Sequence, residues 1–187
     1  MTACRVPQGH ARRGKWLEQA VAATGEIYLA RRVGYLIPHE VVWRHVEIDG
    51  QRRHVRVPSP VDFGGVFRSV ALAFDAKVAN GTNLRAAHVP EHQLDMLERF
   101  TQGTGIGFLL VSFERPDIGM TFACTAAWYR AQLASRPGRA SVSHDVFERA
   151  ARLGRGHCAL VNHGEDSVPV NFGPAAVQLF AAVHGGR

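Results

Sequence analysis

Two acidic segments, with twelve residues between their aspartates, are the strongest candidates for chemistry in this sequence. The first is Pro60-Val61-Asp62 and the second is Asp75-Ala76-Lys77. Aspartate oxygens are hard ligands of the kind that Mg²⁺ prefers, and an ammonium beside them can orient water and offset charge that develops on a phosphate. The pattern is typical of metal-dependent phosphodiester cleavage, with Asp62, Asp75 and the carbonyl of Ala76 as metal ligands and Lys77 beside the attacking water.

Neighbouring strands are needed to bring these groups together. From Val70 to Lys77 apolar residues recur at every second position, which predicts a strand after a turn region at residues 62–65. Because side chains alternate between the faces of a strand, Asp75 and Lys77 must project from the same face. We expect Asp62, at the head of an adjacent strand, to meet them at one edge of the sheet.

Lysine is rare in this chain, which makes its presence at position 77 informative. Of 22 Lys and Arg residues, only Lys15 and Lys77 are lysines. The lysine at position 77 therefore indicates a site that needs a compact ammonium group and not the planar guanidinium of Arg. The alternative interpretation is a solvated Asp/Lys pair on an edge strand.

The remaining pattern predicts helices around a mixed sheet. Apolar spacing predicts a helix from Gly14 to about Arg31, and strands over 41–48 and 51–57 flank an Asp-Gly turn that favours a hairpin. Later segments predict helices over 90–102, 125–134, 143–152 and 175–184, and strands over 106–113 and 120–124. The sequence thus predicts an α/β fold with a mixed central sheet, formed by one domain over residues 14–187 after a flexible basic arm over residues 1–13.

Length and composition fit a single soluble domain. The chain has 187 residues, of which 46% are hydrophobic and 20% charged. Its longest strongly apolar run, Ile106 to Phe113, is far shorter than the ~20 residues of a membrane-spanning helix, and nothing resembles a secretory signal. We therefore expect a cytoplasmic protein with no membrane partner. The three cysteines have no paired spacing and are expected to be reduced, two of them packed.

Positive charge is concentrated in the first third of the chain. The net charge is +6, and residues 1–60 contribute +5 of it, from ten Lys and Arg against five Asp and Glu. A basic surface attracts polyanions, of which nucleic acid is the commonest. The alternative is a basic segment that is merely solvated.

Several segments taken together resemble a known nuclease family. The order Pro-x-Asp and then Asp-x-Lys resembles the PD-(D/E)xK superfamily motif, and the flanking segments resemble RecU-type Holliday junction resolvases, also described as penicillin-binding-protein-related factor A. The matching segments are Arg13-Gly14-Lys15-Trp16-Leu17-Glu18, Ser59-Pro60-Val61-Asp62-Phe63-Gly64-Gly65, Phe74-Asp75-Ala76-Lys77, His92-Gln93 and Gly105-Ile106-Gly107-Phe108-Leu109-Leu110-Val111. The resemblance implies a restriction-endonuclease-like fold and a dimeric, Mg²⁺-dependent endonuclease, with Mn²⁺ as a substitute, that cuts four-way DNA junctions by paired symmetric nicks.

The resemblance also implies a role for individual residues. Asp62 and Asp75 would bind the metal and Lys77 would assist the water. Glu18 would add a carboxylate from the first helix, and Gln93 would position water or phosphate. The plainer interpretation of Glu18 and Gln93 is that both are polar residues on solvated helix surfaces.

The predicted hairpin, residues 41–57, takes the place of the stalk that enters the junction in this family. Basic residues in the hairpin and near the first helix are expected to contact DNA phosphates: Arg12, Arg13, Lys15, Arg44, Arg52 and Arg53. The sequence departs from the family pattern at Asp75, where Glu is more common, and at Pro60, where many members have a hydroxyl residue.

Two alternatives to a junction resolvase remain open. One is an endonuclease of the same superfamily without junction preference. The other is a non-catalytic DNA-binding protein that assists recombination.

Overall fold

The centre of the protein is a seven-stranded sheet with the order β1-β4-β5-β7-β8-β10-β11. The computed structural model describes residues 10–39, 42–48, 51–57, 59, 61–114, 119–135, 138, 140–164 and 167–185. The sheet strands are β1 (Gly34–Pro38), β4 (Phe63–Phe67), β5 (Val70–Asn80), β7 (Ile106–Glu114), β8 (Gly119–Thr125), β10 (Cys158–His163) and β11 (Val170–Asn171). β5 and β7 pair in parallel, whereas the other neighbours pair antiparallel. The expected mixed sheet is confirmed.

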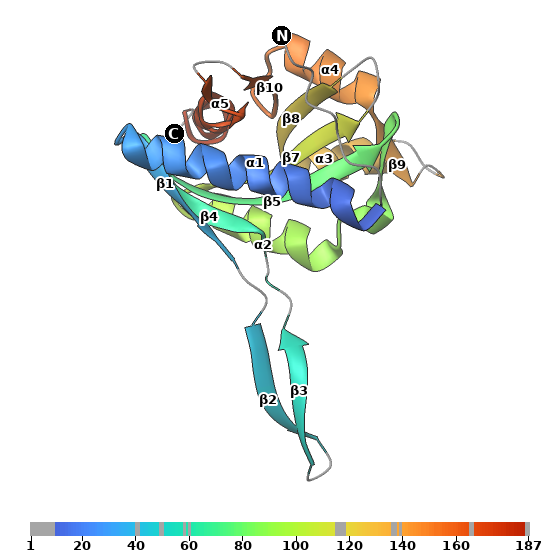
Figure 1. Ribbon diagram of the computed structural model, residues 1–187. Helices are drawn as coiled ribbons and strands as arrows, with labels where there is room; N and C mark the ends of the chain where they lie inside the picture. Colours follow the sequence, from blue (N-terminus) through green and yellow to red (C-terminus); the bar gives the residue numbers. More distant parts are fainter. Residues whose placement is uncertain are drawn as a thin grey trace.

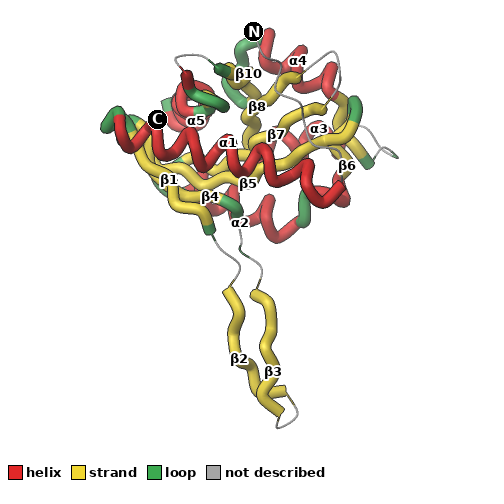
Figure 2. The backbone as a smooth tube through the Cα atoms, viewed as in Figure 1, coloured by secondary structure: helices red, strands yellow, loops and turns green. Residues whose placement is uncertain are grey.

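Helices cover both faces of this sheet (Figure 2). They are α1 (His10–Ala30), α2 (Glu91–Gln102), α3 (Ala126–Ala134), α4 (His144–Arg152) and α5 (Gly173–His184). One hydrophobic cluster joins α1 and α5 to one face, and a second joins α2, α3 and α4 to the other. A 3-10 turn, η1 (Ala86–His88), and the small pair β6 (Asn83–Arg85) and β9 (Ser141–Ser143) complete the described elements.

A hairpin of β2 (Val42–Ile48) and β3 (Gln51–Val57) projects away from the sheet (Figure 1). Ile48 pairs with Gln51, so only two residues connect the strands. Asp49 and Gly50, for which a tight turn was expected, lie outside the described residues. The protruding hairpin itself is confirmed.

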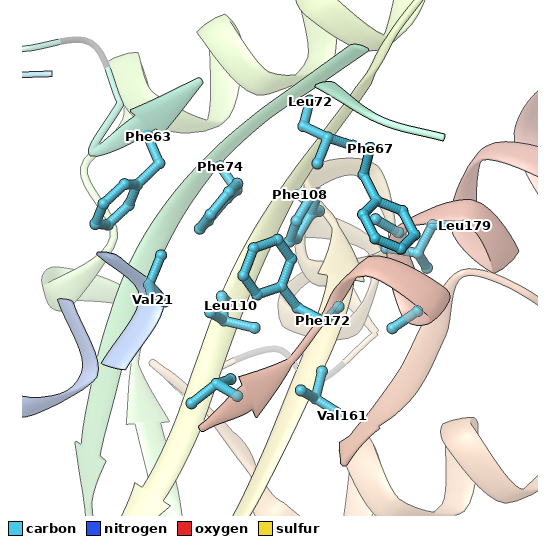
Figure 3. Packing of buried hydrophobic residues seen from close by; sticks show 14 of the residues in the cluster. Val21, Phe63, Phe67, Leu72, Phe74, Phe108, Leu110, Val161, Phe172 and Leu179 are labelled. Atoms are coloured by element: carbon cyan, nitrogen blue, oxygen red, sulfur yellow. The ribbon is translucent and has the colours of Figure 1, made fainter. Parts of the chain in front are cut away.

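Aromatic packing fixes which side chains of β5 reach which face. The ring of Phe74 stacks on Phe63 of β4 at 5.2 Å and on Phe108 of β7 at 4.8 Å, and all three rings are buried beneath α1 and α5 (Figure 3). Burying one such ring contributes about 2–3 kcal/mol. Because side chains alternate along a strand, anchoring Phe74 on this face directs Asp75 to the other.

Some elements differ from the sequence prediction. α1 begins at His10 instead of Gly14, so Arg12 and Arg13 belong to the helix and not to an arm; Ala and Arg are good helix formers. Residues 63–67 form the strand β4 in place of the expected turn, and β10 was not predicted. Ser143 precedes α4 as expected but makes no capping hydrogen bond with its side chain.

The prediction that two cysteines are packed is confirmed. Cys124 and Cys158 are buried free thiols on paired strands, whereas Cys4 lies outside the described residues. In the described part of the chain, no helix combines the length and the apolar character needed to cross a bilayer.

Candidate active site

Asp62 and Asp75 face each other across β4 and β5. The register pairs Phe63 with Phe74. Asp62 directly precedes β4 and Asp75 directly follows Phe74, so continuing this register by one position brings the two aspartates opposite each other. The carboxylate oxygen Oδ2 of Asp62 accepts a hydrogen bond from the backbone N–H of Ala76 at 2.9 Å. The Asp62 carboxyl is close enough to Asp75 to raise the pKa of the Asp75 carboxyl. Sequence positions 13 apart therefore converge at one edge of the sheet.

Asp75 is a buried acid with an unusual proton affinity. Its side chain is fully buried, and burial raises its pKa to about 7. The nearby Asp62 carboxyl also raises this pKa, whereas Lys77 lowers it. Two carboxylates in such close contact repel each other, which a cation between them would relieve.

Lys77 and Gln93 complete the surroundings of Asp75. Lys77 Nζ lies 2.5 Å from Asp75 Oδ2, with the lysine side chain 18% exposed. From α2, Gln93 Nε2 donates a hydrogen bond to Asp75 Oδ1 at 2.8 Å. The carbonyl oxygen Oε1 of Gln93 is buried without a hydrogen-bond partner, so it is free to accept a bond from water or another ligand at this site.

Glu18 approaches the site from α1. Its side chain is exposed on the helix, yet its pKa is raised, first by partial burial and then by the negative charge of Asp62. Lys15 and Lys77 lower the same pKa. Since these charges act on one another, Glu18 lies in the neighbourhood of Asp62 and Lys77.

The donor set fits a hard divalent cation. Asp62 and Asp75 offer carboxylate oxygens, and Ala76 offers its carbonyl. In a strand the N–H and C=O of one residue point the same way, so the carbonyl of Ala76 leaves the strand on the Asp62 side, where its N–H is bonded. Oxygen ligands of this kind are those that Mg²⁺ and Mn²⁺ accept.

The predicted DNA-contacting residues lie in two places. Arg12, Arg13 and Lys15 belong to the first turns of α1, and Lys15 is exposed. Arg44, Arg52 and Arg53 belong to the projecting hairpin, where Arg52 is exposed and opposite Glu47. The side chains of Arg12, Arg13, Arg44 and Arg53 lie outside the described structure.

Two features near the site were missed in the sequence. His39 follows β1 and donates its backbone N–H to the carbonyl of Asp62 at 2.8 Å. Arg130 of α3 contacts three carboxylates on α2, the helix that carries Gln93. The three acids are Glu91, Asp95 and Glu98, whose helical spacing was the only available signal.

Another group of potential metal ligands occurs on α4. Ligand atoms of His144, Asp145 and Glu148 lie within 4.8 Å of one another. Glu148 is already paired with Arg152 at 2.6 Å. This group belongs to a different element from the acidic pair on β4 and β5.

The chain is a member of the PD-(D/E)xK superfamily, with the restriction-endonuclease-like fold expected above. This class is defined by the mixed sheet with its covering helices, and by Asp62 opposite the segment Asp75-x-Lys77. More narrowly, the chain belongs to the family of Recombination protein U, RecU, whose family model matches residues 12–159.

Curated relatives carry the name Holliday junction resolvase RecU. The protein from Oceanobacillus iheyensis is 24% identical over 150 residues, covering 75% of this chain and 76% of that protein. The Geobacillus kaustophilus protein is 26% identical over 178 residues, covering 88% and 80%. The Limosilactobacillus reuteri protein is 28% identical over 120 residues, and this match spans only 58% of either chain.

A solved structure with a related shape is Hjc of Archaeoglobus fulgidus, described as a Holliday junction resolvase from an archaeal hyperthermophile. It covers 71% of this chain and 90% of its own, with a TM-score of 0.44 and 14% sequence identity.

Proposed function

We propose that this protein is a Mg²⁺-dependent endonuclease that resolves four-way DNA junctions by paired symmetric nicks in recombination and repair. Membership of the RecU family and the names of the curated relatives support a junction resolvase. The observation that carries the proposal is the cross-strand apposition of Asp62 and Asp75, with Lys77 2.5 Å from Asp75. A partly exposed cluster of acids with one ammonium suits hydrolysis of a phosphodiester.

Each residue of the site has a distinct part in this proposal. Asp62, Asp75 and the carbonyl of Ala76 hold the cation, and Glu18 adds negative charge from α1. When bound, Mg²⁺ supplies positive charge to the phosphate and makes a nearby water more acidic. Lys77 orients the attacking water and offsets the charge that develops on the phosphate.

Gln93 has two roles in the same proposal. Its Nε2 keeps the Asp75 carboxylate in place through the bond at 2.8 Å. Its unpartnered Oε1 accepts a hydrogen bond from the attacking water, which would satisfy this buried atom.

The DNA partner and the assembly follow from the same reaction. Two symmetric nicks across a junction need two sites related by a two-fold axis, so we propose a homodimer. Basic residues on α1 and the hairpin hold the backbone, and the hairpin is the segment that enters the junction. We place this activity in the cytoplasm.

The decisive experiment incubates the purified full-length protein with a labelled mobile four-way junction, with and without Mg²⁺ and with Mn²⁺ as a substitute. We expect nicking only with a divalent cation. Asp75→Ala should abolish nicking while junction binding, measured with Ca²⁺, is retained. Glu26→Ala, which removes an exposed carboxylate about two turns along α1 from Glu18, serves as the matched control and should nick normally.

Other outcomes would select the alternatives. Equal cutting of a linear duplex with the same sequence would indicate a nuclease without junction preference. Binding without nicking in every cation would indicate a non-catalytic accessory protein.

A further inference from the structure

His39, which directly follows β1, lies next to Asp62 on the side away from Asp75. The register pairs Pro38 of β1 with Phe63 of β4, and the backbone N–H of His39 bonds the carbonyl of Asp62. Residues directly opposite each other in antiparallel strands direct their side chains to the same face, with Cβ atoms about 5 Å apart. His39, Asp62 and Asp75 therefore stand side by side on the face that carries the proposed metal ligands.

Gly64 provides the space in which the His39 ring lies. A Cβ atom added at Gly64 would be 2.8 Å from His39 Nε2 and 3.7 Å from each adjacent ring carbon. Gly64 follows Asp62 by two positions in β4, so the missing side chain would point to the same face as Asp62. The imidazole thus lies over β4 beside the acidic pair, while His39 stays exposed to solvent.

His39 and Lys77 flank the acidic pair on opposite sides. Gly64, beneath the His39 ring, is opposite Ala73 of β5, which precedes Asp75 by two positions. Lys77 follows Asp75 by two positions, in the other direction along the strand. In-line displacement at phosphorus places the attacking and leaving oxygens on opposite sides of the phosphate. The proposed function has Lys77 beside the attacking water, which would put His39 on the side of the leaving oxygen.

We propose that His39 is a further catalytic residue, the general acid that protonates the leaving oxygen of the cut DNA strand. This inference rests on the proposed endonuclease function. A bond forms between the water oxygen and phosphorus, and the bond from phosphorus to the leaving oxygen breaks. A ring N–H proton of His39 passes to that oxygen, the proton of the water goes to solvent, and solvent returns a proton to the ring. Histidine is the side chain most often used for such transfers near neutral pH.

The test compares two junction substrates, one normal and one in which sulfur replaces the leaving bridging oxygen at the cleavage site. Sulfur leaves as a thiolate and needs no proton donor. His39→Gln should slow nicking of the normal junction about 100-fold, whereas its rate on the sulfur junction should stay within about threefold of wild type. Junction binding with Ca²⁺ should be unchanged. His157→Gln, an exposed histidine beside the distant strand β10, is the matched control and should match wild type on both substrates.

A second variant displaces the same ring without altering it. Gly64→Ala puts a methyl group where the ring lies, so it should slow nicking of the normal junction and be rescued by sulfur in the same way. In the double variant, Gly64→Ala should add little to the loss caused by His39→Gln, because both changes remove the same proton donor.

The outcomes separate this inference from the function on which it rests. If wild type nicks and His39→Gln nicks the normal junction at the same rate, His39 is not the acid. Equal losses on both substrates, or weaker junction binding, would assign it to phosphate binding or to folding and overturn the proposal. If wild type nicks neither substrate with Mg²⁺, the endonuclease function itself is wrong.

Discussion

At Asp75, burial raises the pKa of the carboxyl whereas the charge of Lys77 lowers it. The Asp75 pKa of about 7 in the folded protein, against a usual value of 3.8, means that the folded state binds this proton more tightly than the unfolded chain does. The resulting stabilisation is complete below about pH 4 and is lost as the pH rises through about 7. At 1.36 kcal/mol per pKa unit, the loss is at most about 4 kcal/mol.

This sign leads to a stability prediction for the metal-free protein. In the presence of a chelator, the Tm of wild type should fall between pH 4 and pH 8 by several degrees more than the Tm of Asp75→Asn, which has no carboxyl to ionise. Thermal unfolding followed by circular dichroism measures both. Parallel curves for the two proteins would show that Asp75 ionises as freely in the folded state as in the unfolded chain.

Gln93 should control cation affinity through the same carboxyl. Its Nε2 donates to Asp75 Oδ1, a bond that favours the ionised form able to bind Mg²⁺. Gln93→Leu should therefore raise the pKa of Asp75, weaken Mg²⁺ binding at pH 7 about tenfold, and recover most of that loss at pH 9. Isothermal titration at the two pH values measures this. Gln102→Leu, an exposed amide at the end of α2, is the control.

Residue types and spacing could predict only part of this site. Asp75 and Lys77 could be predicted to share a face because side chains alternate along a strand. Asp62 could be predicted to join them because it begins the adjacent strand. His39 could not be found in the same way, because its place depends on the pairing of β1 with β4 and on a missing Cβ at Gly64. The pairing leaves no local signal in the sequence, and Gly64 by itself predicts a turn.

At the scale of elements, α2 is held by one arginine on α3. Arg130 lies 2.5 Å from Glu91, 2.6 Å from Asp95 and 2.8 Å from Glu98, at successive turns of α2. Without the guanidinium, three carboxylates on one helix face would repel one another. Because α2 carries Gln93, this contact also helps to place the amide against Asp75.

Arg130→Gln should therefore lower both stability and activity. We expect a loss of about 1 kcal/mol in the free energy of unfolding, since the pairs are partly exposed, and a several-fold slower nicking rate. Chemical denaturation and single-turnover cleavage measure these effects. Arg152→Gln removes the exposed ion pair with Glu148 on α4 and should cost less than about 0.5 kcal/mol with no change in nicking. Equal effects of Arg130→Gln and Arg152→Gln would show that Arg130 contributes no more than an ordinary exposed ion pair.

Helices and the apolar strand β7 could be predicted closely because their periodicity is local. α2 begins one residue from the predicted Pro90, and β7 ends at Glu114 instead of Phe113. β4 could not be predicted, because Gly64 and Gly65 favour a turn. Pairing with β1 on one side and β5 on the other overrides that preference, and such pairing is a property of the whole sheet.

At the scale of the whole molecule, charge is distributed unevenly along the chain. Residues 1–60, which include α1 and the hairpin, carry +5 of the net charge of +6. Phosphate contacts release counterions, so each should contribute about one to the slope of log affinity against log salt concentration. Substituting Arg12, Arg13, Arg52 or Arg53 one at a time by Gln should lower the slope of junction binding by about one without altering sequence preference. An unchanged slope would place that residue outside the DNA interface.

The paired character of the nicks can be tested by disabling one of two sites. In the proposed homodimer each subunit cuts one strand with its own Asp62 and Asp75, so a mixed dimer of one wild-type and one Asp75→Ala subunit has one working site. Two different affinity tags, used in succession after coexpression, isolate that dimer. On a plasmid with an extruded cruciform, wild type should give linear product, whereas the mixed dimer should stop at a nicked circle. Linear product from the mixed dimer at the wild-type rate would mean that a single site cuts both strands, and the two-fold arrangement would then be unnecessary for resolution.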